Sequence, residues 1–208
     1  VVIAPSTWWY GISSHYPENL DHSPDDWVII ECQVQPRIFA DVRGRFVKVF
    51  HKEAFIELGL ATDFVEEYYS SSHFGVVRGL HFQTPPVDHV KLIYCVQGEV
   101  FDVVLDLRVG SPTYGKTSTF RLDADLGNYL YVPKGLAHGF CVTSEKATLV
   151  YKVSSVYSPQ HDTGILWNSA NIDWPTNTPL LSDRDLSLPS LAEFVSPFSY
   201  QPQHVPGT

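Results

Sequence analysis

Three polar residues lie close together in the stretch "VVRGLHFQTPP", residues 76–86. They are Arg78, His81 and Gln83, and they follow a β-branched pair and precede two prolines. An imidazole titrates near neutral pH, so it can act as a base, bind a metal, or simply be packed with its hydrogen bonds satisfied. The local pattern leaves all three roles open for His81, and other parts of the chain must decide between them.

A second stretch, "LGNYLYVPKGLAHGF" at residues 126–140, fits one half of the cupin signature. Its proline and second glycine make a tight turn that would send His138 into a barrel interior. The other half would need an H-x-H pair and a glutamate, which are the usual donors to a non-haem metal, but the chain has H-F-Q at residues 81–83. His81, Gln83 and His138 make a poor ligand set, so we expect no metal. His138 is then either a hydrogen-bonded barrel residue or a substrate contact.

The elements that must position these residues are short. From residue 27 onward, runs rich in Val, Ile, Tyr and Phe alternate with turn sequences such as "GSPTYG" and "DLGN". Many short strands at regular spacing predict an all-β barrel or jelly roll. Only residues 51–60, "HKEAFIELGL", indicate a helix, with Ala54, Phe55 and Leu58 on one face.

The ends of the chain are dense in proline and polar residues. We expect an irregular N-terminal arm at residues 1–26, a single domain at 27–190 and a C-terminal tail at 191–208 that continues a segment wrapped on the barrel surface. A chain of 208 residues is long enough to build one core of ordinary size.

The composition of the chain limits the kinds of partner that it can bind. With 23 acidic and 14 basic residues the formal net charge is -9, which argues against general binding of nucleic acid, so any phosphate site must be local. No apolar run approaches the roughly 20 residues of a membrane span. Cys32, Cys95 and Cys141 are widely spaced among apolar residues. We therefore expect free thiols and a cytoplasmic protein that does not bind membranes.

The order of motifs resembles one enzyme family. "DVRGRFVKVF", "VVRGLHFQTPP", "KLIYCVQGEVFDVVLDLR", "VPKGLAHGF", "LVYKVSSVYSP" and "LSDRD" occur in the order found in the dTDP-4-dehydrorhamnose 3,5-epimerase family. The match runs from about Cys32 to about Leu188. It implies a cupin-type jelly-roll barrel with a short helix, and an enzyme acting on a nucleotide-linked 4-keto-6-deoxy sugar without a cofactor.

Inversion next to a ketone needs a base on one face, a group that holds the enolate oxygen, and an acid on the other face. The resemblance assigns the base to His81, its orienting carboxylate to Asp185, the acid to Tyr151 and the enolate contact to Lys91. Strand alternation points Tyr151 and its neighbour Lys152 to opposite faces.

The resemblance also implies the binding residues. Arg78 and Arg184 correspond to contacts with the pyrophosphate, for which guanidinium groups have suitable geometry. Arg43 and Phe46 correspond to residues that reach the nucleotide of a neighbouring subunit, which implies a homodimer. The remaining contacts, to the sugar and the nucleotide, fall on Gln83, His138 and Tyr157.

Two departures affect the nucleotide side. Lys48 stands where many members have glutamate, and residues 66–70 read "EEYYS" where many have "QDNHS". Thymidine is the default of the family, but "IDWPTNTPLLSDRD" also resembles relatives that act on GDP-linked deoxyheptoses, so a CDP- or GDP-linked sugar stays open. Also open are inversion at one or both carbons, a metal-dependent cupin oxygenase or isomerase, and a non-catalytic sugar-binding cupin.

Overall fold

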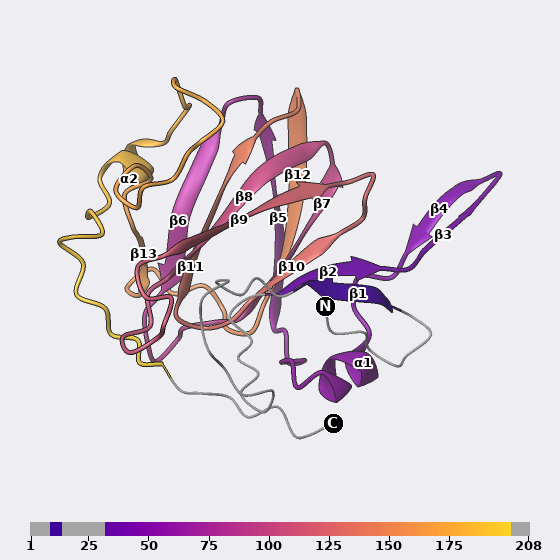
Figure 1. Ribbon diagram of the computed structural model, residues 1–208, viewed down its shortest axis with the longest axis horizontal. Coiled ribbons are helices and arrows are strands. Elements are labelled where there is room, and N and C mark those ends of the chain that lie inside the picture. The colour runs from indigo at the N-terminus through magenta and orange to yellow at the C-terminus, as the bar shows by residue number, and fades with distance from the viewer. Residues whose placement is uncertain (1–8, 14–31, 201–208) are drawn as a thin grey trace.

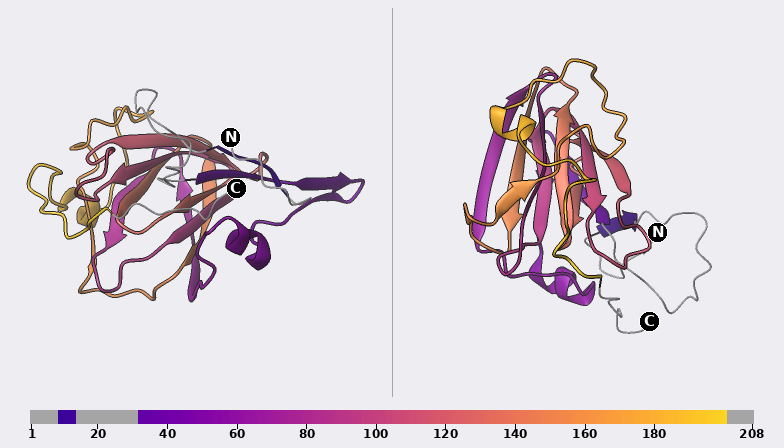
Figure 2. Two further views of the ribbon diagram at one scale, coloured as in Figure 1. Left: turned by 60° about the horizontal axis from the view of Figure 1, so that its bottom comes forward. Right: turned by 90° about the vertical axis from the view of Figure 1, so that its left-hand side faces the viewer.

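The computed structural model describes residues 9–13 and 32–200. Two antiparallel sheets lie face to face, and a hairpin projects from one side (Figures 1 and 2). The six-stranded sheet has the order β1 (Trp9–Ser13), β2 (Cys32–Pro36), β10 (Tyr129–Val132), β7 (Lys91–Gln97), β12 (Lys146–Val153) and β5 (Glu66–His73). The five-stranded sheet has the order β13 (Asp162–Gly164), β6 (Val77–Gln83), β11 (Leu136–Val142), β8 (Glu99–Asp106) and β9 (Thr117–Asp123). The predicted all-β jelly roll is confirmed.

Side-chain alternation decides what lies between the two sheets. In β7, Ile93 and Cys95 join the core between the sheets, whereas Leu92 packs on the outer face. In β12, Leu149 and Tyr151 likewise point inward. The interior is therefore apolar along most of its length, and any polar group at an inward position needs a partner there.

The outer face of the six-stranded sheet is covered by α1 (Lys52–Glu57). The helix begins after His51, whose Nδ1 accepts a hydrogen bond from the Ala54 backbone N–H at 3.4 Å. Ala54 and Phe55 are buried against this sheet, and Leu58 packs beside them. The predicted helix is confirmed with its predicted apolar face, although the helical residues are fewer than the 51–60 run.

The outer face of the five-stranded sheet is covered by the C-terminal part of the chain. Phe198 is buried against Phe82, with ring centroids 5.6 Å apart, and Phe194 packs on the same ring at 5.3 Å. Between these aromatics and β13 the chain forms α2 (Asp183–Leu186). The segment that follows β13 therefore holds α2 against the edge of the sheet that carries β6.

The expectation of a wholly irregular arm at 1–26 is wrong for Trp9–Ser13, which forms β1 and pairs with β2. The exposed edge of β2 offers backbone hydrogen bonds that override the weak strand signal of this stretch. The rest of the arm and residues 201–208 lie outside the described residues.

Cys95 and Cys141 are buried free thiols, as predicted; the side chain of Cys32 is outside the described part. Neither helix in the described ranges is long and apolar enough to cross a membrane.

Candidate active site

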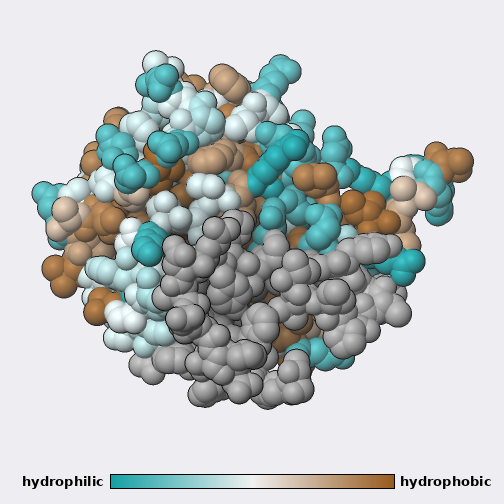
Figure 3. Space-filling model, viewed as in Figure 1, coloured by the Kyte–Doolittle hydropathy of each residue, from teal (hydrophilic) through white to brown (hydrophobic). Residues whose placement is uncertain are grey.

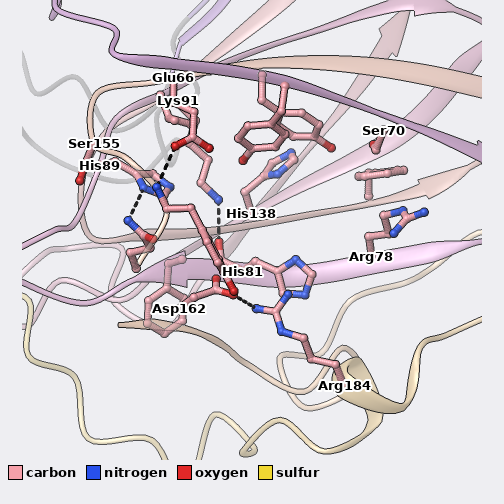
Figure 4. Close-up of a pocket in the computed structure, with 17 residues that line it drawn as sticks. Glu66, Ser70, Arg78, His81, His89, Lys91, His138, Ser155, Asp162 and Arg184 are labelled. Carbon is pink, nitrogen blue, oxygen red and sulfur yellow. Dashed lines mark hydrogen bonds and ion pairs between the residues drawn. The ribbon is translucent and has the colours of Figure 1, made fainter. Parts of the chain in front are cut away.

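A cavity of about 340 Å³ lies between the two sheets. Its walls come from β5, β7 and β12 on one side and from β6 and β11 on the other (Figure 4). Most of the residues predicted for the site line it: Arg78, His81, Gln83, Lys91, His138, Tyr151, Tyr157 and Arg184. Strands that are far apart in sequence therefore bring one set of polar side chains into a single space.

Arg78 and His81 face this cavity together because β6 is irregular between them. In an unbroken strand, residues three positions apart point to opposite faces. Here His138 of β11 is opposite His81 while Phe140 is opposite Arg78, so a two-residue step on β11 matches a three-residue step on β6. Gly79 permits the bulge: its φ is +134°, and a Cβ there would lie 2.5 Å from a backbone atom of β11. The two polar side chains of the motif are thus turned to one side.

His81 is paired with Asp185. The His81 Nε2 and Asp185 Oδ1 atoms are 2.5 Å apart. Asp185 is only 3% exposed and lies in α2, where its backbone N–H donates to Ser182 Oγ at 3.2 Å. A carboxylate on Nε2 keeps the proton on that nitrogen and leaves Nδ1 as the basic one.

The charges of this pair are set by its surroundings. Burial lowers the pKa of His81 below its ordinary 6.5, and this effect outweighs the opposing influence of Asp185. Burial by itself would raise the pKa of Asp185, but the hydrogen bonds to His81 and Ser182 hold that pKa below its usual value. At neutral pH the site therefore holds a neutral imidazole beside an ionised carboxylate, which is the state a general base requires.

Tyr151 enters the cavity from the opposite sheet. It belongs to β12 and is 7% exposed, and burial raises the pKa of its phenol far above 10. The hydroxyl therefore stays protonated at neutral pH and is available as a proton donor. Its neighbour Lys152 points to the other face, where it forms an ion pair with Glu67 at 2.7 Å.

Lys91 is a deeply buried cation in the cavity wall. Its Nζ donates a hydrogen bond to the His81 backbone carbonyl at 2.9 Å, and the residue is 5% exposed. Burial lowers the pKa of Lys91 to about 8, against the attraction of Asp162 and Asp102. A lysine in this position can stabilise negative charge that develops on a bound ligand.

His138 is both hydrogen-bonded and part of the cavity wall. Its Nε2 lies 2.8 Å from Asp102 Oδ2, and both residues are almost fully buried. Sequence reasoning missed Asp102, although strand alternation could have found it: Val100 and Val104, two residues to either side, are inward core residues.

Gln83 lines the cavity, and its side chain forms hydrogen bonds to the backbone of neighbouring loops. Its Nε2 donates to the Val87 carbonyl at 2.8 Å and to the Val156 carbonyl at 3.2 Å, and its Oε1 accepts from the Ser158 backbone N–H at 2.6 Å. Gln83 therefore ties two loops together at the rim.

Within residues 9–13 and 32–200, no three His, Cys, Asp or Glu side chains are grouped so that they could hold a metal ion.

Two arginines line the cavity. Arg78 donates to Ser72 Oγ at 2.9 Å. Arg184 donates to Asp162 Oδ2 at 2.7 Å (Figure 4). The ring of Tyr157, which is 59% exposed, adds an aromatic surface to the cavity wall. Arginines beside an exposed aromatic ring suit a phosphorylated ligand with a flat base.

Arg43 and Phe46 do not line the cavity of their own chain. They lie on the projecting hairpin of β3 (Ile38–Asp41) and β4 (Gly44–Val47). Arg43 pairs with Asp41 within that hairpin. Figure 3 shows hydrophobic atoms at the tip of the projecting hairpin, beside hydrophilic ones. Val42 is fully exposed and Phe46 is 60% exposed.

The fold is that of cupin-type jelly-roll enzymes, and the groups gathered between its sheets are those of acid–base chemistry: a histidine–carboxylate pair, a buried tyrosine and a lysine. The chain belongs to the dTDP-4-dehydrorhamnose 3,5-epimerase family, whose model matches residues 29–193. It is an isomerase that acts on carbohydrates.

Individual relatives agree with this assignment. The chain is 46% identical over 156 residues to a dTDP-4-dehydrorhamnose 3,5-epimerase of Shigella flexneri, covering 74% of this chain and 86% of the relative. It is 44% identical over 164 residues to a dTDP-4-dehydrorhamnose 3-epimerase of Streptomyces niveus, covering 77% and 79%. The crystal structure of a 3,5-epimerase from Bacillus anthracis, with TDP and pyrophosphate bound, matches with a TM-score of 0.77 at 38% identity and covers 87% of this chain and all of that one.

Proposed function

We propose that this enzyme converts dTDP-4-dehydro-6-deoxyglucose to dTDP-4-dehydrorhamnose by inverting C3 and C5. The names of the relatives and the TDP in the related crystal structure support a thymidine nucleotide. The observation that carries the proposal is the arrangement of base and acid: His81, which is paired with Asp185, belongs to one wall of the cavity, and Tyr151 belongs to the other.

Each inversion proceeds in two proton transfers. His81 Nδ1 takes the proton from the carbon next to the C4 ketone, and the electron pair moves onto the C4 oxygen to give an enolate. Lys91 stabilises that oxygen, as a cation can do strongly in a site that excludes water. Tyr151 then delivers a proton to the opposite face of the same carbon. The ketone itself accepts the electrons, so this chemistry requires no cofactor.

Arg78 and Arg184 hold the pyrophosphate. The chain is acidic overall, but both guanidinium groups reach the cavity that also contains Lys91. Arginine binds phosphate oxygens through paired N–H donors, which fixes the orientation of the ligand as well as its position. Because the pyrophosphate is held in place, the attached sugar is held in one orientation between His81 and Tyr151.

The functional unit is a homodimer. The β3–β4 hairpin extends away from the body and carries exposed Phe39, Val42 and Phe46 together with Arg43. Exposed apolar side chains on a projecting hairpin are suited to contact with a second copy, where Phe46 and Arg43 would complete the nucleotide end of the neighbouring cavity. Cys95 and Cys141 as free thiols suit the reducing cytoplasm, where we place the enzyme.

The test is a panel of dTDP-, CDP- and GDP-linked 4-keto-6-deoxy sugars, followed by proton NMR in D₂O. We expect turnover of the dTDP sugar, with deuterium entering C3 and C5 and both centres inverted. Turnover of only the CDP or GDP sugar would overturn the nucleotide assignment, and inversion at C3 alone would overturn the assignment of both carbons. Absence of exchange with every sugar would overturn the reaction itself.

A further inference from the structure

Tyr68 lies directly on the proposed acid. It belongs to β5, and in the pairing of β5 with β12 it is the residue opposite Tyr151. The two rings are stacked, with centroids 4.9 Å apart and planes inclined by 16°. Tyr68 is 41% exposed and lines the same cavity, so it covers one face of the Tyr151 ring while remaining within reach of a ligand.

A second ring also restricts Tyr151. The imidazole of His138 meets the Tyr151 ring edge to face, with centroids 6.0 Å apart and planes at 72°. His138 is itself fixed by its hydrogen bond to the buried Asp102. Tyr151 thus sits between a rigid neighbour and Tyr68, and rotation of its ring away from the present orientation would have to break the stack with Tyr68.

Tyr68 adds no charge beside the acid. Burial, with Glu66 and Asp162 nearby, raises the pKa of Tyr68 to about 12, so its phenol is neutral under working conditions. An anionic neighbour would oppose proton loss from Tyr151, whereas a neutral ring contributes only packing.

We propose that Tyr68 is a positioning residue that holds the Tyr151 hydroxyl on the line of proton delivery to the sugar. This inference rests on the proposed function, in which Tyr151 is the acid. Cross-strand aromatic pairs are a recognised means of fixing side chains on a sheet. The aromatic ring of Tyr68, rather than its hydroxyl, carries the effect.

The two fates of the enolate supply a specific readout. Once His81 has removed a proton and that proton has exchanged with a solvent deuteron, His81 can return the deuteron to the same face, which gives exchange with retained configuration. Tyr151 can instead deliver a proton or deuteron to the opposite face, which gives inversion. A displaced acid slows only the second route. A general loss of folding or binding slows both routes in the same proportion, so the ratio of inversion to exchange separates positioning from structural damage.

The experiment compares Tyr68→Ala, Tyr68→Phe and the control Tyr69→Ala in D₂O by proton NMR. Tyr69 is the next residue of the same strand and is 73% exposed. For Tyr68→Ala we expect the ratio of inversion to exchange to fall roughly 10- to 100-fold, since misplacing a catalytic group by about 1 Å costs about 10²-fold. Tyr68→Phe and Tyr69→Ala should retain the ratio of the unmodified enzyme.

Three results would overturn the proposal: an unchanged ratio in Tyr68→Ala, an equal loss of exchange and inversion in that variant, or a loss in Tyr68→Phe as large as in Tyr68→Ala. Tyr151→Phe, measured in parallel, distinguishes a failure of the Tyr68 proposal from a failure of the proposed function. If Tyr151→Phe still inverts the sugar at the normal rate, the acid assignment is wrong; if it does not, a negative result at Tyr68 counts against Tyr68 alone.

Discussion

His81 and Tyr151 extend into one cavity from opposite sheets of the jelly roll. His81 comes from β6 of the five-stranded sheet and Tyr151 from β12 of the six-stranded sheet, so a sugar ring bound between the sheets would present one face to each. Inversion needs a base and an acid on opposite faces, and a two-layer fold supplies this relation through its architecture.

Asp185→Asn should reduce kcat roughly 10²- to 10⁴-fold, the range that general acid–base groups contribute. The amide cannot hold the His81 proton on Nε2 as the carboxylate does, so Nδ1 is no longer reliably the basic nitrogen. Because Asp185 raises the pKa of His81, its removal should also shift the acidic limb of the kcat/KM profile to lower pH. An acidic limb that moves to higher pH would contradict the pairing.

The pH profile of the unmodified enzyme should have two limbs. The acidic limb lies below pH 6.5, because burial lowers the pKa of His81 from that value and activity requires its neutral form. The alkaline limb lies near pH 8, where Lys91 loses its charge in the free enzyme. Lys91→Gln should lower kcat at every pH and abolish the alkaline limb of kcat/KM. An alkaline limb near pH 8 that persists in this variant would show that another group causes it.

Gly79→Ala tests the bulge that turns Arg78 and His81 to one side. A Cβ at Gly79 would lie 2.5 Å from the backbone of β11, and the φ of +134° is unfavourable for alanine. We expect a loss of about 3 kcal/mol or more in the free energy of unfolding, because overpacking and backbone strain each cost about 1–3 kcal/mol.

Gly75→Ala is the matched control for this substitution. Gly75 also has a positive φ, of +76°, but a Cβ there would meet nothing within 4 Å. Its cost should be limited to the conformational penalty of about 1–2 kcal/mol. Denaturant unfolding measures the free energy of unfolding of both variants. An equal loss in the two variants would mean that the close contact at Gly79 is unimportant.

Regular alternation made part of the site predictable. The inward orientation of Tyr151 and the outward orientation of Lys152 follow from a two-residue period and hold in the structure. The same rule could have identified Asp102, which lies at an inward position of β8. The bulge in β6 breaks the rule, so alternation alone would have placed Arg78 and His81 on opposite faces.

Long-range relations were not available from spacing. His81 and Asp185 lie 104 positions apart, and only the family resemblance predicted that they meet. The strand at Trp9–Ser13 was missed because its formation depends on the open edge of β2 rather than on its own composition. The stack of Tyr68 on Tyr151 depends on the register of β5 against β12, which no local pattern encodes.

Deuterium exchange in His81→Ala and Tyr151→Phe tests most directly whether His81 is the base and Tyr151 the acid. With the dTDP-4-keto sugar in D₂O, the unmodified enzyme should exchange and invert C3 and C5. His81→Ala should do neither, whereas Tyr151→Phe should still exchange protons with retained configuration and lose inversion. Normal inversion in either variant, with its fold confirmed by circular dichroism, would contradict the account.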